Sequence, residues 1–215
     1  MKPVIASLAL ALFATTAIPA LADPVADRVE GLARAWDHVN YEVPMTTRKA
    51  EMEKLAGQAD AVVAQNPTRA EPLVWDAIIT ASEGGLKGGL DGLSLAGKAR
   101  DMLVKAESIN PGVLDGSVYT TLGSLYSQVP GFPVGFGDKT KARSYLAKAV
   151  QVSPTGIDSN YFLGDFLIRQ HDYAGAAKAL EKALAAPARP GREAGDRGRR
   201  AEVQALLSEA QKKAH

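Results

Sequence analysis

The most constraining feature of this sequence is one spacing of small and large residues that occurs three times, each time ahead of a proline. In each copy an alanine is followed four positions later by a leucine and three positions after that by a second alanine. An alanine one turn from a leucine lets a neighbouring helix approach closely, and the proline ends the helix because it lacks an N–H. The copies are Ala99, Leu103, Ala106 and Pro111; Ala142, Leu146, Ala149 and Pro154; and Ala176, Leu180, Ala183 and Pro187, where the proline comes one residue early. We therefore expect a series of similar, closely packed helices.

A second helix is expected upstream of each copy. The spacing large-x2-Leu-Gly-x2-Tyr occurs at Tyr119, Leu122, Gly123 and Tyr126, recurs without its first aromatic at Asn160, Leu163, Gly164 and Leu167, and has a poorer copy at Trp75 and Ile78. The sequence thus predicts an all-α chain whose antiparallel helix pairs stack as a right-handed solenoid, with repeats at 67–111, 112–154 and 155–187. No alternating apolar pattern is present, which disfavours a sheet.

The first two repeats are longer than the third, and the extra residues fall between the two helices of each pair. The extra length is eight residues in the first repeat and seven in the second. We interpret Glu83–Leu93 and Val129–Asp138 as long loops inside their repeats. Because equivalent turns of a stacked array emerge on the same edge, the two loops are expected to be neighbours.

The rest of the chain predicts three further helices. Two precede the repeats, at about 26–39 and 46–65. Residues 188–215 form an arginine-rich linker and a C-terminal capping helix that begins near Asp196, a candidate N-cap. Residues 23–215 are expected to form one helical domain.

Residues 1–22 have the pattern of a cleaved signal peptide. Lys2 is followed by an apolar run of fifteen residues and by Ala20-Leu21-Ala22, a small-x-small cleavage signature. The run is shorter than the roughly 20 residues a spanning helix needs. We expect cleavage after Ala22 and a periplasmic protein that does not span the membrane.

Charge and cysteine content exclude several classes of partner and site. Without Lys2 the chain has 24 basic and 24 acidic residues, so no global charge favours nucleic acid or anionic lipid. The chain has no cysteine, which excludes disulfides, thiolate metal ligands and a lipid-modified cysteine. Stability must therefore come from packing.

The helix-pair residues resemble a degenerate tetratricopeptide array over about Leu55 to Pro187. More narrowly, the stretches LGSLYSQVPGFPVGFGD, KARSYLAKAV and NYFLGDFL resemble the T-component family of tripartite ATP-independent periplasmic (TRAP) transporters. That resemblance implies a helical periplasmic protein that associates with a substrate-binding protein and encloses a channel or groove for a small organic solute. Family members are commonly anchored through a lipid-modified cysteine, from which this chain departs.

The proline-rich segment Val129–Asp138 has two interpretations. Its glycines permit close backbone approach and its prolines stiffen the path, which is unlike a flexible linker. In one interpretation Phe132 and Phe136 line a binding groove. In the other they plug the gap between neighbouring repeats, while Asp138 caps the next helix.

The glycine-rich segment Glu83–Leu93 resembles a phosphate-binding loop only superficially, because neither a Lys-Ser/Thr pair nor a preceding strand accompanies it. We interpret it as a hinge or as a closely packed loop, with Glu83 and Lys87 as candidates for the same binding edge.

The arginine-rich linker is the only local concentration of basic residues. Arg189 and Arg192 are candidates for binding a carboxylate or phosphate in bidentate fashion. The alternative is that Glu193, Asp196 and Glu202 neutralise the linker. Tyr126 and Tyr161 occupy first-helix positions, which are mostly core but also line the concave face of such arrays.

Signatures of chemistry are missing from the sequence. It contains no G-x-S-x-G motif, no paired histidines of metal-ligand spacing and no calcium-loop pattern. Asp158, Asp165 and Asp172 are interpreted as caps and surface charges. We expect no catalytic residue, no cofactor and no metal.

The sequence therefore predicts a non-catalytic exported helical-repeat protein. It is expected to bind a periplasmic protein partner, a small organic solute or both, as an accessory to solute transport, and homo-oligomerisation stays open. The alternative is an envelope or secretion assembly scaffold without a small ligand, and an enzyme is the third choice.

Overall fold

The computed structural model describes residues 23–214, and every regular element in that range is an α-helix. The helices are α1 (Pro24–Tyr41), α2 (Met45–Gln65), α3 (Ala70–Lys87), α4 (Gly89–Ile109), α5 (Val113–Gln128), α6 (Lys139–Val152), α7 (Ile157–Arg169), α8 (Tyr173–Leu184) and α9 (Glu193–Lys213). The predicted all-α fold is confirmed. None of these helices is long and apolar enough to cross a membrane. The predicted signal peptide, residues 1–22, lies outside the described residues.

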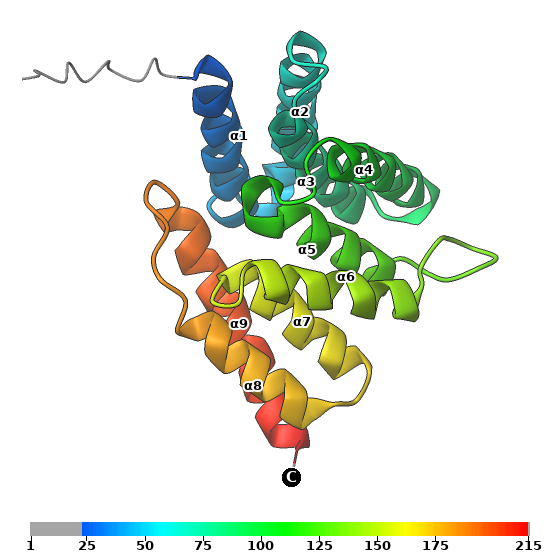
Figure 1. Ribbon diagram of the computed structural model, residues 1–215, viewed down its shortest axis with the longest axis vertical. Coiled ribbons are helices and arrows are strands. Elements are labelled where there is room, and N and C mark those ends of the chain that lie inside the picture. Colours follow the sequence, from blue (N-terminus) through cyan, green and yellow to red (C-terminus); the bar gives the residue numbers. More distant parts are fainter. Residues whose placement is uncertain (1–22, 215) are drawn as a thin grey trace, which may run out of the picture.

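The helices form two layers (Figure 1). The odd-numbered helices contact one another in chain order, and α9 also contacts α1, so that they close into a ring. Each even-numbered helix packs against the odd-numbered helices before and after it. Within residues 23–214 the backbones of no two even-numbered helices come close, although side chains such as Lys98 of α4 and Asp60 of α2 pair between them. The odd-numbered helices therefore surround the interior, and α2, α4, α6 and α8 lie outside them.

The repeated small and large residues form the contacts within the helix pairs. All nine alanines and leucines of the three copies are 0% exposed. A Cβ atom on Gly123 would lie 2.6 Å from Cγ of Leu146, and one on Gly164 would lie 2.6 Å from Cγ of Leu180. In α5 and α7 the glycine thus makes room for the leucine of the following helix, which explains why both residues recur at fixed spacing in these two pairs.

The glycine-rich segment is not a loop, and that prediction is wrong. Residues 83–87 end α3, residues 89–93 begin α4, and only Gly88 lies between the helices. Gly88 and Gly89 have φ angles of 66° and 56°, which glycine adopts without a Cβ clash. A Cβ on Gly92 would lie 2.6 Å from the carbonyl oxygen of Gly84, so the helices meet too closely for any side chain there. The extra residues therefore lengthen α3 and α4, and only Val129–Asp138 is a long loop within a repeat.

Two of the helix caps expected from the sequence are present in the structure, and a third is not. The Asp138 carboxylate accepts hydrogen bonds from the backbone N–H groups of Thr140 and Lys141, as a cap of α6 should. Asp172 caps α8, directly after His171 with its positive φ of 62°. Asp196, however, lies within the first turn of α9, which begins at Glu193. Its carboxylate accepts from the backbone N–H of Arg189 instead, because the linker folds back over the helix start.

We predict that Gly123→Ala lowers the free energy of unfolding by about 1–3 kcal/mol, because the new methyl group overpacks the contact with Leu146. Gly57→Ala is the matched control, since a Cβ on Gly57 in α2 meets no atom within 4 Å. The control should raise stability by about 0.5–1 kcal/mol, the usual gain for a helical alanine over glycine. Urea unfolding of both variants measures the difference. Equal changes of the same sign would contradict the close approach of α5 and α6.

The carboxyl group of Asp76 is buried where α3 packs against α2 and α4, which lowers the stability of the fold when the group is charged. Asp76 of α3 is 1% exposed and accepts a hydrogen bond from Thr80 Oγ1 over 3.2 Å. Asp60 of α2 lies beside it and pairs with Lys98 of α4 over 3.0 Å. Burial raises the pKa of Asp76 to about 6, and the charge of Asp60 adds to that shift. The folded state therefore favours the protonated carboxyl.

A raised pKa in the folded state means that stability falls as pH rises from about 4 to about 6. Asp76→Asn removes the charge and should raise the free energy of unfolding at pH 8 by about 1–3 kcal/mol. The advantage over the unmodified protein should shrink at pH 4.5, where the native carboxyl is mostly protonated. Chemical denaturation of both proteins at the two pH values tests this. If the variant gains more stability over the parent at pH 4.5 than at pH 8, the raised pKa of Asp76 is contradicted.

Candidate functional site

Two adjoining cavities lie inside the ring of odd-numbered helices. The first has a volume of about 300 Å³ and is bordered by the N-terminal part of α1, the starts of α5 and α7, and the linker before α9. The second has a volume of about 320 Å³ and is bordered by the later parts of α3 and α5 and by α9. Six residues line both: Trp75, Ser117, Thr120, Asp158, Arg189 and Arg192.

Three arginines reach the cavities from the linker and α9, and all three are held by carboxylates. Arg189 bonds Asp158 and Asp196, each over 2.7 Å. Arg199 bonds the same Asp158 over 2.8 Å and Glu202 over 2.6 Å. The cluster is completed by Arg192, which grips Asp37 of α1 with two nitrogens. Three positive charges thus face four negative ones, and the cluster carries no surplus positive charge.

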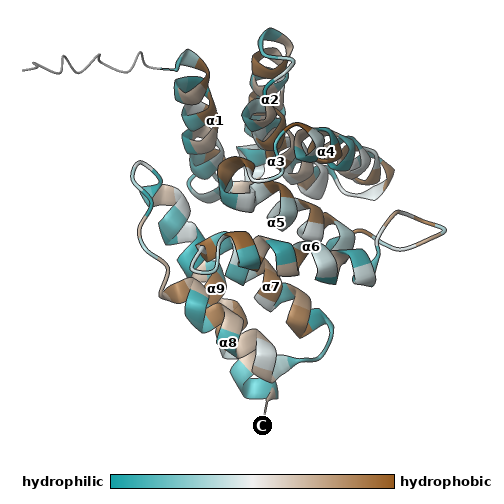
Figure 2. Cartoon of the chain, viewed as in Figure 1, coloured by the Kyte–Doolittle hydropathy of each residue, from teal (hydrophilic) through white to brown (hydrophobic). Residues whose placement is uncertain are grey.

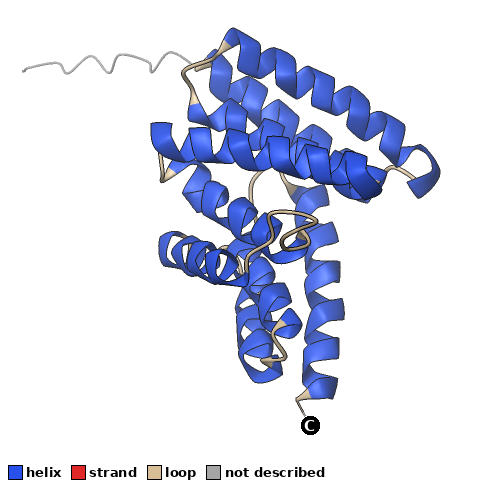
Figure 3. Cartoon of the chain, turned by 90° about the vertical axis from the view of Figure 1, so that its right-hand side faces the viewer, coloured by secondary structure: helices blue, strands red, loops and turns tan. Residues whose placement is uncertain are grey.

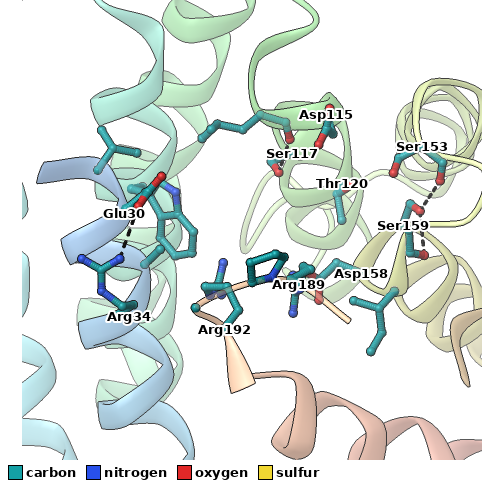
Figure 4. A pocket seen from close by; sticks show the side chains of 18 residues that line it. Glu30, Arg34, Asp115, Ser117, Thr120, Ser153, Asp158, Ser159, Arg189 and Arg192 are labelled. Carbon is teal, nitrogen blue, oxygen red and sulfur yellow. Dashed lines mark hydrogen bonds and ion pairs between the residues drawn. The ribbon is translucent and has the colours of Figure 1, made fainter. Parts of the chain in front are cut away.

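Two of the guanidinium groups keep one terminal nitrogen free for a ligand. Nη2 of Arg189 and Nη1 of Arg192 have no hydrogen-bond partner among residues 23–214. Figure 4 shows Arg189 and Arg192 entering the first cavity beside Asp158. The ion pairs fix the positions of these side chains and leave donors available, which is how a preorganised binding site is built.

Asp158 is held as a carboxylate by its arginines. Burial raises the pKa of Asp158, but the charges of Arg199 and Arg189 outweigh burial and bring the pKa below its ordinary value. A carboxyl group of low pKa is a poor proton donor and a weak base near neutral pH.

Aromatic rings line the cavities next to the arginine cluster. The guanidinium carbon of Arg192 lies 4.9 Å from the ring centre of Trp75, and that of Arg199 lies 5.0 Å from the ring of Phe162. Trp36 sits 6.2 Å from Trp75 and donates its indole N–H to Ser82 Oγ over 2.8 Å. Arginine and tryptophan side chains therefore brace one another at the edge of the cavities.

A row of hydroxyl groups on α5 lines the side of the cavities formed by that helix. Ser117 Oγ donates to the carbonyl of Leu114 over 2.6 Å, and Thr121 Oγ1 donates to the carbonyl of Ser117 over 2.8 Å. Because their protons are used in this way, the hydroxyl oxygens can offer the cavities only acceptors. The α5 wall thus accepts hydrogen bonds, and the arginine side donates them.

The backbone that borders the first cavity is strained. Leu114 and Asp115 have φ angles of 50° and 52°, in the left-handed region that costs energy for residues other than glycine. Both residues line the first cavity, at the turn that enters α5. Strain of this kind persists where the surrounding structure fixes it and is frequent at binding sites.

The ring is closed by contacts between α9 and α1. Gly195 lies against Asp37 and Gly198 lies against Tyr41, so closely that any side chain on either glycine would clash. Tyr41 donates to Glu202 over 3.3 Å, and Arg197 pairs with Glu42 over 3.0 Å at the exposed side of the same contact. Without this contact α9 would not enclose the cavities.

The structure brings together only part of the set of site residues that the sequence suggests. Arg189 and Arg192 line both cavities. Tyr161 lies next to them, with Arg199 4.3 Å from its ring centre. The sequence also offered the alternative that acidic residues neutralise the arginines of the linker. Asp196 and Glu202 do so, by pairing with Arg189 and Arg199.

The other candidates lie outside both cavities. Glu83 and Lys87 pair with each other over 2.7 Å at the end of α3. Phe136 packs edge-on against Tyr126, with ring centres 5.5 Å apart, and beneath Arg100 of the preceding repeat. Phe132 is 93% exposed, so the plug interpretation is wrong for this residue. Asp138 serves as a helix cap.

Sequence reasoning missed several cavity residues. Asp158 appears in the sequence as a cap, but the structure makes it the shared partner of two arginines. Trp36, Trp75 and Arg199 belong to segments far apart in the chain, so only closure of the ring assembles them. The one sequence signal for these cavity residues was that large side chains recur in the first helix of each pair.

Comparisons with known proteins do not identify a relative. No protein-family model matches the chain, and no curated protein is significantly similar to it. Within residues 23–214 no three histidine or acidic side chains gather as a metal site requires. The candidate site therefore rests on geometry alone.

We predict that Asp37→Asn lowers the free energy of unfolding by about 2–4 kcal/mol, because it leaves Arg192 in a largely buried position without a counter-charge. Glu42→Gln is the matched control: it breaks the other α1–α9 pair, whose side chains are 43% and 70% exposed, and should cost less than about 1 kcal/mol. Thermal and urea unfolding compare the two variants. Equally small losses would mean that the Asp37–Arg192 pair does not hold the ring closed.

Proposed function

We propose that this chain is a non-catalytic binding protein that holds a small organic solute inside the ring of odd-numbered helices. The observation that carries the proposal is the enclosure of two adjoining cavities lined by arginine donors, hydroxyl acceptors and aromatic rings. Small-molecule sites combine a concave, largely apolar lining with a few fixed polar groups in this way.

The dimensions and the chemistry of the cavities support a small ligand. Their volumes of about 300 and 320 Å³ stand at the lower end of the roughly 300–1,000 Å³ typical of such sites. Free guanidinium nitrogens favour a ligand rich in acceptor oxygens. Because the pKa of Asp158 is lowered by its arginines, this carboxylate serves to position them rather than to transfer protons.

The proposal agrees with the family resemblance of the sequence. In this proposal the helix pairs are tetratricopeptide-like repeats, and the chain is exported and serves as an accessory to solute transport beside a periplasmic protein partner. The fixed contacts of Gly123 with Leu146 and of Gly164 with Leu180 support the repeat assignment.

A second candidate function is an assembly scaffold without a small ligand. It is favoured by the arginine cluster, whose charges are fully met by Asp37, Asp158, Asp196 and Glu202. In that case the cavities hold only water, and the cluster serves to close the ring.

The two tryptophans of the chain make the first proposal directly testable, since both line the second cavity. Small molecules extracted from the freshly purified protein are identified by mass spectrometry and added back to the stripped protein. We expect a concentration-dependent change of tryptophan fluorescence and a higher melting temperature, because the ligand binds only the folded state.

Thr121→Phe supplies the matching variant, because the larger side chain occupies part of the second cavity. It should weaken the binding of the extracted molecule at least about tenfold, a change of roughly 1.4 kcal/mol. Ser144→Phe, on the exposed face of α6, is the control and should leave binding unchanged. If no molecule is recovered and none of the fractions alters the fluorescence, the scaffold function is favoured instead.

A further inference from the structure

The loop between α5 and α6, Val129–Asp138, stands out from the helices in Figure 1 and lies in front of them when that side of the molecule faces the viewer (Figure 3). It is nevertheless ordered by its own backbone. At its base Gly137 N–H donates to the Pro130 carbonyl over 2.9 Å, and Asp138 N–H donates to the Tyr126 carbonyl over 2.9 Å. The close approach of the two arms excludes any side chain at Gly137, which explains the glycine.

Inside this α5–α6 loop the two phenylalanines have opposite environments. Phe136 turns inward, against Tyr126 and beneath the guanidinium of Arg100, which lies 4.5 Å from its ring centre. Phe132 turns outward and is 93% exposed, more than any other large hydrophobic residue among residues 23–214. Val134 is 64% exposed beside it. The loop is coloured partly as hydrophobic in Figure 2.

The exposed charged side chains directly after the α5–α6 loop are positive. No charged residue occurs between Asp115 and Asp138, so Asp138 is the one charged residue of the loop. Lys139 and Lys141, directly after it, are exposed and form no ion pair within residues 23–214. The Asp138 carboxylate is engaged by two backbone N–H groups of α6. An apolar tip is thus followed by two exposed lysines without an ion pair in the described residues, and Nζ of Lys141 also lies 5.2 Å from the ring centre of Tyr126.

We propose that the α5–α6 loop is a docking element that inserts Phe132 into an apolar pocket of a folded protein partner, with Asp or Glu side chains at the pocket rim facing Lys139 and Lys141. A single aromatic side chain in a desolvated pocket can supply much of the energy of an interface. The fixed backbone of the loop means that little conformational freedom is lost on binding.

A lipid surface is the weaker candidate for this loop. Phe132 and Val134 together carry fewer carbons than a myristoyl chain, and one such chain gives only marginal membrane binding. Two lysines also fall short of the clusters of about four to eight basic residues that anionic membranes recognise. The site is independent of the solute proposal, since no residue of 129–138 lines either cavity.

The first test places the photo-crosslinking residue p-benzoylphenylalanine at position 132 of the full chain, in the cells that produce it. Position 104 is the control, because Val104 is an exposed hydrophobic residue, 47% accessible, on α4. We expect illumination to join position 132, and not position 104, to one protein, at a peptide that lines an apolar pocket with acidic residues at its rim. The adduct should be lost when Lys139→Glu and Lys141→Glu are combined.

The proposal is overturned if position 132 forms no protein adduct, or if position 104 forms the same adducts. It is also overturned if position 132 crosslinks to lipid or to a second copy of this chain. Survival of the adduct in the double charge-reversal variant would contradict the acidic rim.

The second test uses the purified protein identified by the adduct as the binding probe in calorimetry. Phe132→Ser should weaken its binding at least about tenfold, in keeping with the loss of an aromatic anchor. Phe132→Trp should retain binding, and Val104→Ser should leave it unchanged. All three variants should keep the melting temperature of the parent and its increase on addition of the solute, because both side chains are exposed. An affinity within about twofold of the parent for Phe132→Ser would sink the docking role while leaving the solute proposal intact.

Discussion

The ion pair between Asp37 and Arg192 is the interaction on which the inner architecture depends. It joins the first helix to the segment that leads into the last one, and Asp37 is only 2% exposed. A buried carboxylate is costly unless a cation meets it, so the pair excludes arrangements in which α9 lies away from α1. Gly195 and Gly198 make the approach sterically feasible. Direct packing of α9 against α1 and this charge requirement together close the ring.

Closure of the ring explains why charged and aromatic residues share the interior. Five helices around a common centre leave space that their side chains do not fill, and the polar cluster keeps that space from collapsing onto an apolar core. Asp158 bridges Arg189 and Arg199, and Trp75 braces Arg192. Removing water from such a cluster is unfavourable unless a ligand replaces the hydrogen bonds that water makes to the free guanidinium nitrogens. The same groups that hold the ring together therefore define what it can bind.

The two glycine-rich insertions show how similar compositions produce different structures. Around Gly88 the glycines bring two helices together in a single-residue turn, because the segment contains no proline and its glycines, although poor helix formers, keep their backbone N–H groups. Around Phe132 the prolines at positions 130 and 133 remove backbone donors and stop the helix, so that an insertion of similar length must form a loop. One insertion thus extends the packing of α3 with α4, and the other leaves an aromatic side chain in solvent.

The sequence by itself determined that the chain is helical and which residues are buried within the helix pairs, although it missed that residues 83–93 continue α3 and α4. Alanine, leucine and glycine at fixed spacing act between neighbours along the chain, where periodicity is informative: Leu146 and Leu180 are buried as their positions predict. The caps at Asp138 and Asp172 are equally local. Only the tertiary structure decided the site. Trp36, Trp75, Asp158 and Arg199 come from four helices, and their proximity depends on where α9 docks, which is fixed by burial of charge between distant segments rather than by any local pattern.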